Sequence, residues 1–396
     1  MTASPRMLEG LRVVDLTTVI FGPYCTQILA DLGAEVVKVE PPEGDHTRII
    51  GTPAHTPGMG PVHLRLNRGK RSVDWDLKSE AGRAAMHALI ATADIFIHNV
   101  RSEAIARAGL SYEAVRAIRP DILYVHCTGF DQRGPYASLQ AYDDIIQAAT
   151  GVATLPPRVD GNPAPRFVPM TMADKVSGLH AAYAVMAGVV HRLRTGEGQR
   201  IEVPMFESVA SFNLLEHLCD ASFVPPTGPA LYPRQIDPNR QPMATSDGWI
   251  AIAPYMDDRW LRFFDAAGHP EALDRPELAT KELRRKNMTL MYAAAARILP
   301  ERSTAEWLAI LERANVPAMR VNEIADLPAN PQLLASGLLR QRHHPTEGDY
   351  LEVGAPVRFS AYAGRELAHA ATAGQHSDEI ARELGIAPPP RKDTSA

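Results

Sequence analysis

The sequence predicts an α/β protein with a large doubly wound domain and a smaller α+β domain. Short apolar runs of β character alternate with amphipathic segments through the first half of the chain, which is the pattern of β-α-β units and a parallel sheet. A stretch rich in proline and polar residues, 223–242, then breaks this alternation. The chain of 396 residues is long enough for two such domains.

The large domain is expected to be Rossmann-like. Its strands are predicted at 11–16, 35–40, 71–77, 94–100, 121–127 and 200–206. Its helices are predicted at 24–32, 79–91, 103–108, 175–194 and 207–219. In such a sheet, ligands bind beyond the carboxyl ends of the strands. Those ends supply Ile20, Phe21, Lys78, Asn99 and the segment 128–136.

The small domain is expected to begin with a hairpin that turns at Asp247 and Gly248. Helices of this domain are predicted to follow at 257–267, 284–298 and 304–313. The chain then returns to the large domain, with strand-like pieces near 351–360, a last helix at 378–384 and a tail at 387–396. The predicted large domain is 1–222 with 336–396, the small domain 243–315, and the linkers 223–242 and 316–335.

Composition bounds the class of protein. The hydrophobic share of 45% with 22% charged residues is that of an ordinary globular protein, and a net charge of −5 argues against a nucleic-acid partner. No signal peptide is expected, and the longest apolar run, 181–190, is about half of the ~20 residues that a membrane span needs. The three separated cysteines fit a cytoplasmic protein without disulfides, and no spacing predicts a metal site.

The first β-α turn argues against a dinucleotide-binding enzyme. Such enzymes need several glycines there, so that the backbone can approach a pyrophosphate. The turn 17–25 contains Gly22 alone.

The helix predicted at 175–194 is the main candidate for the protein's chemistry. Arg192 and Arg194 suit its carboxyl end, Gly196 predicts its stop, and Asp174 stands at its front as a candidate N-cap. Its apolar residues recur three or four positions apart and predict one buried face: Val176, Leu179, Tyr183, Met186, Val190 and Leu193.

Two interpretations of Asp174 stay open on this pattern. The carboxylate caps the helix by accepting hydrogen bonds from free backbone N–H groups, as most acidic residues at such positions do. Alternatively it is a covalent nucleophile, since the same N–H groups can stabilise charge on an acyl group bonded to it.

Six segments, taken in order, carry a resemblance to a known family: LEGLRVVDLTTVIFGPYCTQILADLGAEVVKVEPPEGD, NRGKRSVDWDLKSEAGR, ADIFIHNVRSEAIARAGLSYE, YVHCTGFDQRGPYA, YDDIIQAATG and HRLRTGEGQRIEVPMFES. They resemble the family III CoA-transferases, the group of formyl-CoA transferase, crotonobetainyl/carnitine CoA-transferase and α-methylacyl-CoA racemase. The resemblance is strong from about 8 to 213 and weaker up to about 360.

The resemblance implies an enzyme that moves CoA from an acyl-CoA donor to a free carboxylic acid, with no tightly bound cofactor. Asp174 matches the family's nucleophile, which passes through an aspartyl anhydride and an aspartyl-CoA thioester. Asp143 matches an acidic residue near the thioester, and Tyr142 lies beside it.

The CoA contacts of the family are carried over by position. They are Ile20, Phe21, Arg48, Trp75, Asp76, Leu77, Lys78, Asn99, Val100, Arg101, Arg107 and Gln140. The sequence departs from the family at two places. Pro41 stands where formyl-CoA transferase often has arginine, and Gln140 replaces a lysine.

Two other functions stay open. The racemase branch uses a histidine where Tyr142 stands, and tyrosine is a poor general base at neutral pH. A non-catalytic acyl-CoA-binding protein is the third interpretation. Arg166 and the segment 233–241 are candidates for binding a dicarboxylate, although solvated loop charges explain them better. The resemblance also implies a homodimer of interlocked, ring-shaped chains.

Overall fold

The computed structural model describes residues 6–362 and 366–390 of the chain. Contacts divide the chain into two compact units. The first contains 1–150, 167–213 and 331–396, and the second contains 151–166 and 214–330. The first unit therefore combines described residues from the amino-terminal half with residues from 331 onward. The last six residues of the predicted tail lie outside the described residues.

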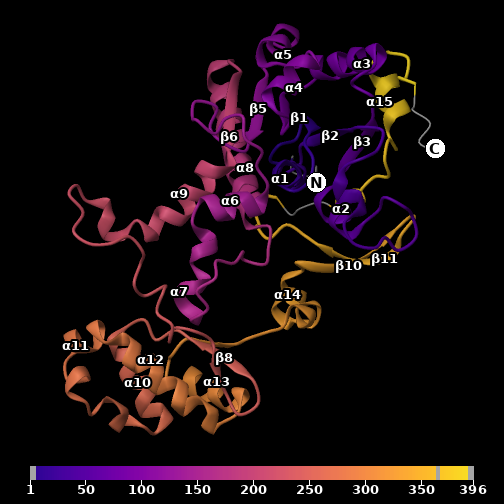
Figure 1. Cartoon of the computed structure of the whole chain (residues 1–396). Coiled ribbons are helices and arrows are strands. Elements are labelled where there is room, and N and C mark those ends of the chain that lie inside the picture. Colours follow the sequence, from indigo (N-terminus) through magenta and orange to yellow (C-terminus); the bar gives the residue numbers. More distant parts are fainter. Residues whose placement is uncertain (1–5, 363–365, 391–396) are drawn as a thin grey trace. The chain divides into compact units, whose positions relative to one another are not determined.

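A parallel sheet forms the centre of the first unit (Figure 1). Within the described residues it has six strands in the order β3-β2-β1-β4-β5-β6. The strands are β1 (Arg12–Leu16), β2 (Glu35–Glu40), β3 (Lys70–Asp74), β4 (Ile95–His98), β5 (Leu123–Thr128) and β6 (Gln199–Pro204). Strand β1 pairs with β2 on one side and with β4 on the other, so the order reverses beside β1. The predicted parallel sheet is confirmed, and such a reversal is where open α/β sheets bind ligands.

Helices connect and cover these strands. The predicted ones are found as α1 (Phe21–Asp31), α3 (Glu80–Ala91), α4 (Ser102–Arg107), α8 (Met172–Thr195), α9 (Met205–His217) and α15 (Ser377–Glu383). Helices α2 (Pro61–Leu66), α5 (Tyr112–Ile118), α6 (Asp143–Ala149) and α14 (Pro331–Ser336) were not predicted. Ser79 caps α3 by accepting a hydrogen bond from the Gly82 N–H.

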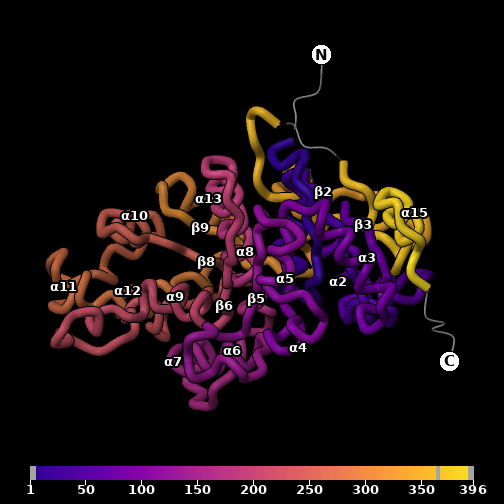
Figure 2. Tube along the Cα trace, turned by 90° about the horizontal axis from the view of Figure 1, so that it is seen from above, coloured from indigo at the N-terminus to yellow at the C-terminus, as the bar shows by residue number. Residues whose placement is uncertain are grey.

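Apolar side chains from β1 to β5 pack against α3, α5 and α15 in one core. Helix α15 lies beside β3 in two perpendicular views (Figures 1 and 2). The Ser377 hydroxyl accepts a hydrogen bond from the Asp74 N–H at 3.1 Å, and the His376 N–H donates to the Ser72 carbonyl at 2.9 Å. These bonds fix the carboxyl-terminal part of the chain to the edge of the sheet. The hairpin of β10 (Leu339–His344) and β11 (Gly348–Val353) belongs to the same unit.

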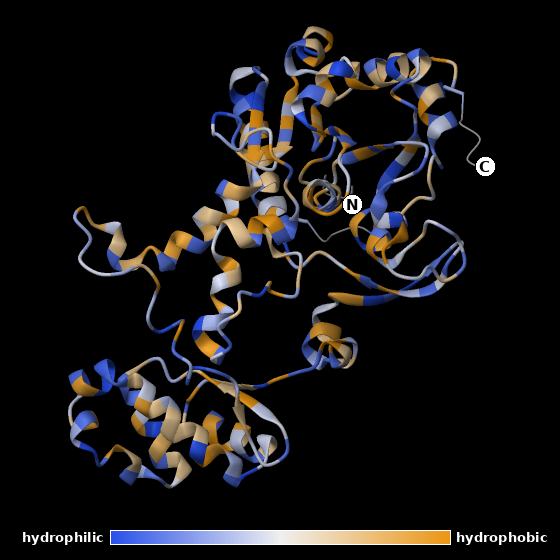
Figure 3. Ribbon diagram, viewed as in Figure 1, coloured by the Kyte–Doolittle hydropathy of each residue, from blue (hydrophilic) through white to orange (hydrophobic). Residues whose placement is uncertain are grey.

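The second unit contains a small antiparallel sheet of β7 (Met243–Ala244), β8 (Trp249–Ile252) and β9 (Ala318–Arg320). Its helices are α7 (Pro156–Asp160), α10 (Asp257–Ala267), α11 (Lys281–Lys286), α12 (Met288–Ile298) and α13 (Thr304–Arg313). Helices α10 and α13 carry both hydrophobic and hydrophilic residues (Figure 3). Their apolar sides meet around Trp260 and Trp307, which are completely buried.

The predicted elements of this unit are largely confirmed. The hairpin from Met243 to Ile252 is present, but Met243 pairs with Ile250 and Ala244 with Trp249, so its turn centres on Ser246 and Asp247, one residue before the predicted position. The helix predicted at 284–298 is two helices, because α11 ends at Lys286 and α12 begins at Met288. The unit includes 151–166 and resumes at Leu214, whereas the sequence boundaries assigned these residues to the large domain. Those boundaries stay a prediction. In the described part of the chain, every helix is too short or too polar to span a membrane.

Helix α8 corrects the prediction of its buried face. Of the apolar residues expected to be buried, Leu179, Tyr183, Val190 and Leu193 are exposed. The buried face consists mostly of small residues: Ala173, Ser177, Gly178, Ala181, Ala182 and Gly188, with Val176, Val185 and Val189. Small side chains let α8 lie close to its neighbours, since a Cβ atom at Gly188 would come within 2.7 Å of the Ile201 side chain. The period of large apolar residues therefore identified a face that this chain leaves exposed.

Candidate active site

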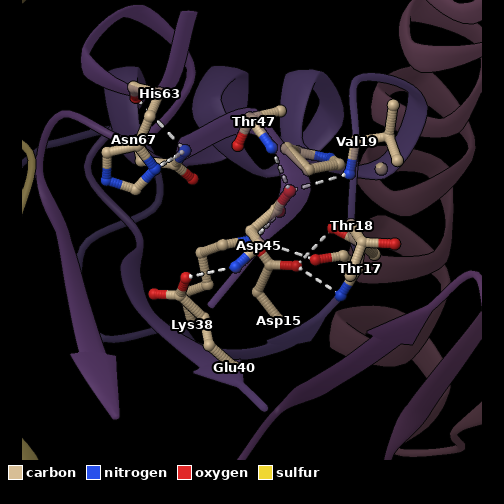
Figure 4. Close-up of polar contacts among 12 residues, drawn as sticks. Asp15, Thr17, Thr18, Val19, Lys38, Glu40, Asp45, Thr47, His63 and Asn67 are labelled. Carbon is tan, nitrogen blue, oxygen red and sulfur yellow. Dashed lines mark hydrogen bonds and ion pairs between the residues drawn. The ribbon is translucent and has the colours of Figure 1, made fainter. Parts of the chain in front are cut away.

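Buried charged residues hold the loop after β1 in place (Figure 4). Lys38 Nζ donates to Asp45 Oδ2 at 2.7 Å and to the Thr17 carbonyl at 2.8 Å. Asp45 Oδ1 accepts hydrogen bonds from the Val19 N–H at 3.2 Å and the Thr47 N–H at 2.9 Å. Burial acts to raise the pKa of Asp45, but Lys38 and these hydrogen bonds outweigh it and lower the pKa. Asp45 is thus a charged anchor for the loop that precedes Ile20 and Phe21.

Val19 shows that this anchoring overrides local preference. Its φ angle is 67°, a left-handed conformation that is unfavourable for a β-branched residue. Such conformations persist where the surrounding contacts enforce them. The bond from the Val19 N–H to Asp45 is one of these contacts.

The end of β4 is fastened to the same loop. Asn99 Oδ1 accepts from the Thr18 N–H at 3.0 Å, and Asn99 Nδ2 donates to the Thr18 carbonyl at 2.9 Å. His126 Nε2 donates to the Val100 carbonyl at 3.1 Å. The carboxyl ends of β1, β4 and β5 are therefore connected through side chains, and the predicted residues Asn99 and Val100 lie at their junction.

A cavity of about 310 Å³ opens at the ends of β4 and β5. Four of the predicted CoA contacts line it: Asn99, Val100, Arg101 and Arg107. Arg107 is largely exposed, and it pairs with Glu103 at 4.0 Å, also exposed. Such a surface pair contributes little, so the guanidinium can turn to another anion. The cavity also contains Thr128, Gly129 and Gln132 from the segment 128–136.

Helix α8 lies against the start of α1. A Cβ atom placed on Gly178 would be 2.9 Å from the Phe21 carbonyl oxygen and 3.0 Å from the Tyr24 ring. Only glycine permits this approach of the two backbones. Gly178 lies one helical turn after Asp174, so the close packing places the Ile20–Phe21 segment near the amino end of α8.

Asp174 does not cap its helix, and the prediction of an N-cap was wrong. Helix α8 begins at Met172, its N-cap is Thr171, and Asp174 is the third residue of the first turn. No side chain caps the helix amides from the N-cap position. Within the described residues, the Asp174 carboxylate has no hydrogen-bond partner, although its residue is buried with 8% exposure.

Asp143 lies beside Asp174 at the first position of α6. Its Oδ1 accepts a hydrogen bond from the Asp174 backbone N–H at 2.9 Å. Burial, with the Asp143 charge as a second cause, raises the pKa of Asp174 to about 7, and Lys175 opposes this only in part. The amide of Met172 also has an acceptor, the Met170 carbonyl. The helix front thus offers fewer free N–H groups than the sequence suggested.

Comparison with known proteins agrees with this geometry. The sequence matches the family model described as CoA-transferase family III over residues 8–377. The chain belongs to CoA-transferase family III. The prediction of a CoA-transferase is confirmed at the level of the family.

Curated relatives of this family III chain match almost its whole length. It is 31% identical to human succinyl-CoA:glutarate CoA-transferase over 386 residues, which cover 95% of this chain and 86% of the relative. It is also 31% identical to succinate–glutarate CoA-transferase of Agrobacterium fabrum, with 95% of each chain covered. Acetyl-CoA:oxalate CoA-transferase of Acetobacter aceti is 33% identical, with 89% of each chain covered.

Solved structures show the same family III fold. A CaiB/BaiF family protein from Brucella suis has a TM-score of 0.82 and 29% identity, covering 96% of this chain and 100% of the other. The protein Rv3272 from Mycobacterium tuberculosis has a TM-score of 0.81 and 25% identity, with 96% and 100% covered.

Some predicted contacts lie apart from the cavity. Arg48 is buried, and its guanidinium pairs with Glu40 at 2.6 Å and donates to the Ala371 carbonyl. This engagement favours a structural role and argues against a phosphate contact. Trp75 is buried in the core, whereas Asp76, Leu77 and Lys78 follow β3 toward α3 and do not line the cavity.

Two predicted residues beside the cavity are exposed. Gln140 follows the cavity residue Leu139, and its side chain is accessible. Tyr142 is the N-cap residue of α6 and is 66% exposed. An exposed phenol has no local cause for the acid–base activation that proton transfer from carbon requires.

Sequence reasoning missed other residues of the site. Thr128 lines the cavity and is buried, and its hydroxyl has no hydrogen-bond partner among the described residues. The segment containing Thr128 was identified as a strand end, but the hydroxyl was not singled out. Gln147 was missed entirely because α6 was not predicted. Its side chain is buried and hydrogen-bonded to Asp143.

Proposed function

We propose that this enzyme transfers CoA from an acyl-CoA to a free carboxylic acid, with Asp174 as the covalent nucleophile. The observation that carries the proposal is the Asp174 carboxylate, buried at the start of α8 without a hydrogen-bond partner among the described residues. A carboxylate that only stabilised the fold would be paired with a cation or with backbone amides. One that attacks a thioester needs oxygens that are not engaged.

The proposed reaction divides the exchange into four steps. The Asp174 carboxylate attacks the thioester carbonyl and expels the CoA thiolate, which leaves a mixed anhydride. The thiolate attacks the aspartyl carbonyl, forms an aspartyl-CoA thioester and releases the donor acid. The acceptor carboxylate attacks this thioester and again expels the thiolate, forming a second anhydride. The thiolate then attacks the acceptor's acyl carbonyl, which releases the new acyl-CoA and restores Asp174.

The electrostatic surroundings support this role. Because burial raises the pKa of Asp174 to about 7, a substantial fraction of its carboxyl groups is ionised near neutral pH. A poorly solvated carboxylate is also a better nucleophile than one surrounded by water, because fewer hydrogen bonds must be broken before it reacts.

The cavity beyond β4 and β5 supports binding of the nucleotide part of CoA. Arg101 and Arg107 line it, and arginine suits phosphate groups because its planar fork offers paired donors. The loop at Ile20 and Phe21 and the segment 75–78 are proposed as further contacts. Gln140 is a proposed contact beside Leu139, and Asp143 and Tyr142 are proposed to lie near the thioester.

A dicarboxylic acid is the proposed acceptor class. The curated relatives are named for glutarate, succinate and oxalate. Arg166 is not the candidate for binding the second carboxylate, because its guanidinium already pairs with Asp160 and donates to the Ala164 carbonyl. A panel of acyl-CoA donors and acids, with products identified by mass spectrometry, would establish the pair.

A homodimer is also proposed, with the interlocking that the family resemblance implies. The exposed apolar residues of α8 support it, since Leu179, Tyr183, Val190 and Leu193 lie on one long helix and are each about half exposed or more. Such a contiguous apolar surface is typical of a protein interface. A cytoplasmic location, expected from the cysteine content, stays a prediction.

Substitution of Asp174 tests the mechanism. In Asp174→Asn, exchange of labelled acid into acyl-CoA is expected to fall by at least about 10³-fold, because an amide cannot form the anhydride. The wild-type enzyme incubated with acyl-CoA should form an enzyme–CoA adduct that hydroxylamine cleaves, and the variant should not. The control is Asp144→Asn, an exposed neighbour of Asp143.

Other outcomes identify the alternatives. Retained acid exchange in Asp174→Asn contradicts the covalent role. Exchange of the α-proton of a 2-methylacyl-CoA with deuterated water, without need of an acceptor acid, would indicate a racemase. CoA binding without adduct formation would indicate a binding protein.

A further inference from the structure

We propose that Gln147 is a positioning residue for Asp174. Its side-chain amide fixes the Asp143 carboxylate and the backbone before α8, so that the helix presents Asp174 in one orientation. The inference rests on the proposed role of Asp174 as nucleophile. Gln147 lies on α6, four residues after Asp143, and its side chain is completely buried.

Four hydrogen bonds surround the Gln147 side chain. Nε2 donates to Asp143 Oδ2 at 2.7 Å, to the Met170 carbonyl at 3.1 Å and to the Val168 carbonyl at 3.3 Å. Oε1 accepts from the Val168 N–H at 2.8 Å. One buried amide therefore joins α6 to the bend at 168–171 that leads into α8.

This pattern fixes the orientation of the amide. A turn of 180° about the last side-chain bond would place Oε1 against two carbonyl oxygens and a carboxylate oxygen, and would place Nε2 against an N–H group. Each of these contacts would be repulsive, and buried polar groups without partners are costly. The Val168 N–H and the two carbonyls therefore determine that Nε2 faces Asp143.

The same pattern makes Asp143 an acceptor at both oxygens. Oδ2 receives the Gln147 amide, and Oδ1 receives the Asp174 backbone N–H. Both oxygens of Asp143 are thus held by donors, one on α6 and one on α8. Asp143 in turn fixes the third amide of α8, which is the amide of the proposed nucleophile. Gln147 thus acts on Asp174 by two routes, through Asp143 and through the bend that starts the helix.

The substitution Gln147→Glu tests this arrangement because it retains the shape of the side chain. When the introduced carboxyl group is ionised, a carboxylate replaces the Nε2 donor opposite Asp143. When that group is protonated, its hydroxyl can donate to Asp143 as the amide does. Gln147 contacts one charged group directly, Asp143 on α6, and Asp143 in turn interacts with Asp174 on α8, on which Lys175 also acts.

The expected result is a loss of kcat that depends on pH. At about pH 8, kcat of Gln147→Glu should fall ~10- to 100-fold with little change in KM for acyl-CoA, since misplacing a reacting group by about 1 Å costs rates of this size. The ratio of variant to wild-type kcat should rise as the pH falls toward about 6. A merely structural defect would lower stability and raise KM without this recovery.

The chain offers a matched control in Gln27. This glutamine is also buried, and its Nε2 also donates to an aspartate four residues away, Asp31 Oδ1, at 3.1 Å. Gln27→Glu therefore introduces the same charge beside a carboxylate, in a helix that does not contain Asp143. Its printed hydrogen bond goes to Asp31 and not to Asp143 or the 168–171 bend, so the reacting groups keep their positions, and kcat per folded protein should stay within about twofold of wild type at every pH. If Gln147→Glu loses no more activity than Gln27→Glu, the proposal is wrong.

Hydrogen exchange separates failure of this inference from failure of the proposed function. Amides in 168–176 should exchange faster in Gln147→Glu than in wild type at about pH 8, and unchanged in Gln27→Glu. Unchanged exchange in both overturns the proposal, even if the wild type transfers no CoA. If Gln147→Glu does not fold, Gln147→Asn removes the same contacts without a charge and must show the same losses of exchange protection and kcat.

Discussion

Two buried aspartates of the large unit, Asp45 and Asp174, differ in what surrounds them. Asp45 faces the Lys38 ammonium at 2.7 Å and accepts two backbone N–H groups, and its pKa is lowered although burial acts to raise it. Asp174 is also buried, but its larger charge interaction is with another carboxylate, Asp143, and its pKa is raised to about 7.

The difference shows how one residue type serves two purposes. A buried carboxylate with a cation and hydrogen-bond donors stays charged, and it anchors backbone. A buried carboxylate without them is unstable as an anion and reactive toward electrophiles. In this chain Asp45, with its partners, holds the loop at Thr17–Val19, whereas Asp174, without them, lies in the first turn of α8. The following predictions test that contrast.

The largest effect is expected for Asp45→Asn. Removing this charge takes away the carboxylate closest to the buried Lys38 ammonium, and breaking a buried pair typically costs about 3–5 kcal/mol. Asp15 and Glu40 also act on Lys38, so the loss should lie near the lower end of that range. Urea unfolding at neutral pH measures the loss. The control is Asp349→Asn, which removes an exposed partner of His343 and should cost less than about 1 kcal/mol.

The linked pH dependence has a defined sign. The pKa of Asp45 is lower in the folded state, so its contribution to stability is present above the pKa of the unfolded chain and is lost as the pH falls. The difference in stability between wild type and Asp45→Asn should therefore shrink in acid. A variant as stable as wild type at neutral pH would contradict the anchoring role.

The same substitution at Asp174 should have the opposite effect. Because the pKa of Asp174 is raised in the folded state, its contribution to stability is lost as the pH rises from the ordinary carboxyl pKa near 4 to about 7, and the loss is complete above that. Asp174→Asn removes the charge and should stabilise the protein by roughly 1–4 kcal/mol at about pH 8, with a smaller gain at about pH 5. Unfolding at the two pH values tests this. A destabilised variant at the higher pH would mean that the carboxylate has a structural partner.

The contrast also explains what the sequence could predict. The strand 35–40 and the helix 257–267 were predicted to the residue, because each is a short, strongly patterned segment with clear ends. The parallel sheet itself follows from alternating β and α elements. The ion pair of Lys38 with Asp45 did not follow, because two charged residues near a strand give no sign that both are buried.

The candidate site was predicted in part. Asp174 was found through the family resemblance. The sequence pattern placed it at the N-cap of its helix, but the N-cap is Thr171, three residues earlier, where the preceding bend ends. Helix α6 was missed since it has only seven residues and follows a long loop. The role of Gln147 could therefore not be predicted, because it depends on hydrogen bonds to the 168–171 backbone, about 20 residues further along the chain.

A smaller effect is expected at Gly178, where α8 packs against the start of α1. An added methyl group in Gly178→Ala would meet the Phe21 carbonyl, a backbone atom that cannot turn away. Overpacking of this kind typically costs about 1–3 kcal/mol. The KM for acyl-CoA should also rise, since Phe21 follows the loop that Asp45 anchors. In Gly134→Ala the new atom would lie at an ordinary 3.5 Å from its nearest neighbour, so this control should leave stability unchanged.

The smallest effect is a shift in pH dependence caused by Asp143→Asn. In the wild type, kcat/KM should fall as the pH decreases through about 7, because protonated Asp174 cannot attack. Burial is the larger cause of the raised pKa of Asp174 and Asp143 the second, so neutralising Asp143 should move this acid limb down by less than about one pH unit. The maximum rate should fall as well, since the asparagine NH₂ must face either the Asp174 N–H or the Gln147 amide. The pH midpoint of the acid limb is measured independently of the maximum rate, and Asp144→Asn should leave that midpoint unchanged. A midpoint that moves upward in Asp143→Asn would show that Asp143 is not the charge that distinguishes Asp174 from Asp45.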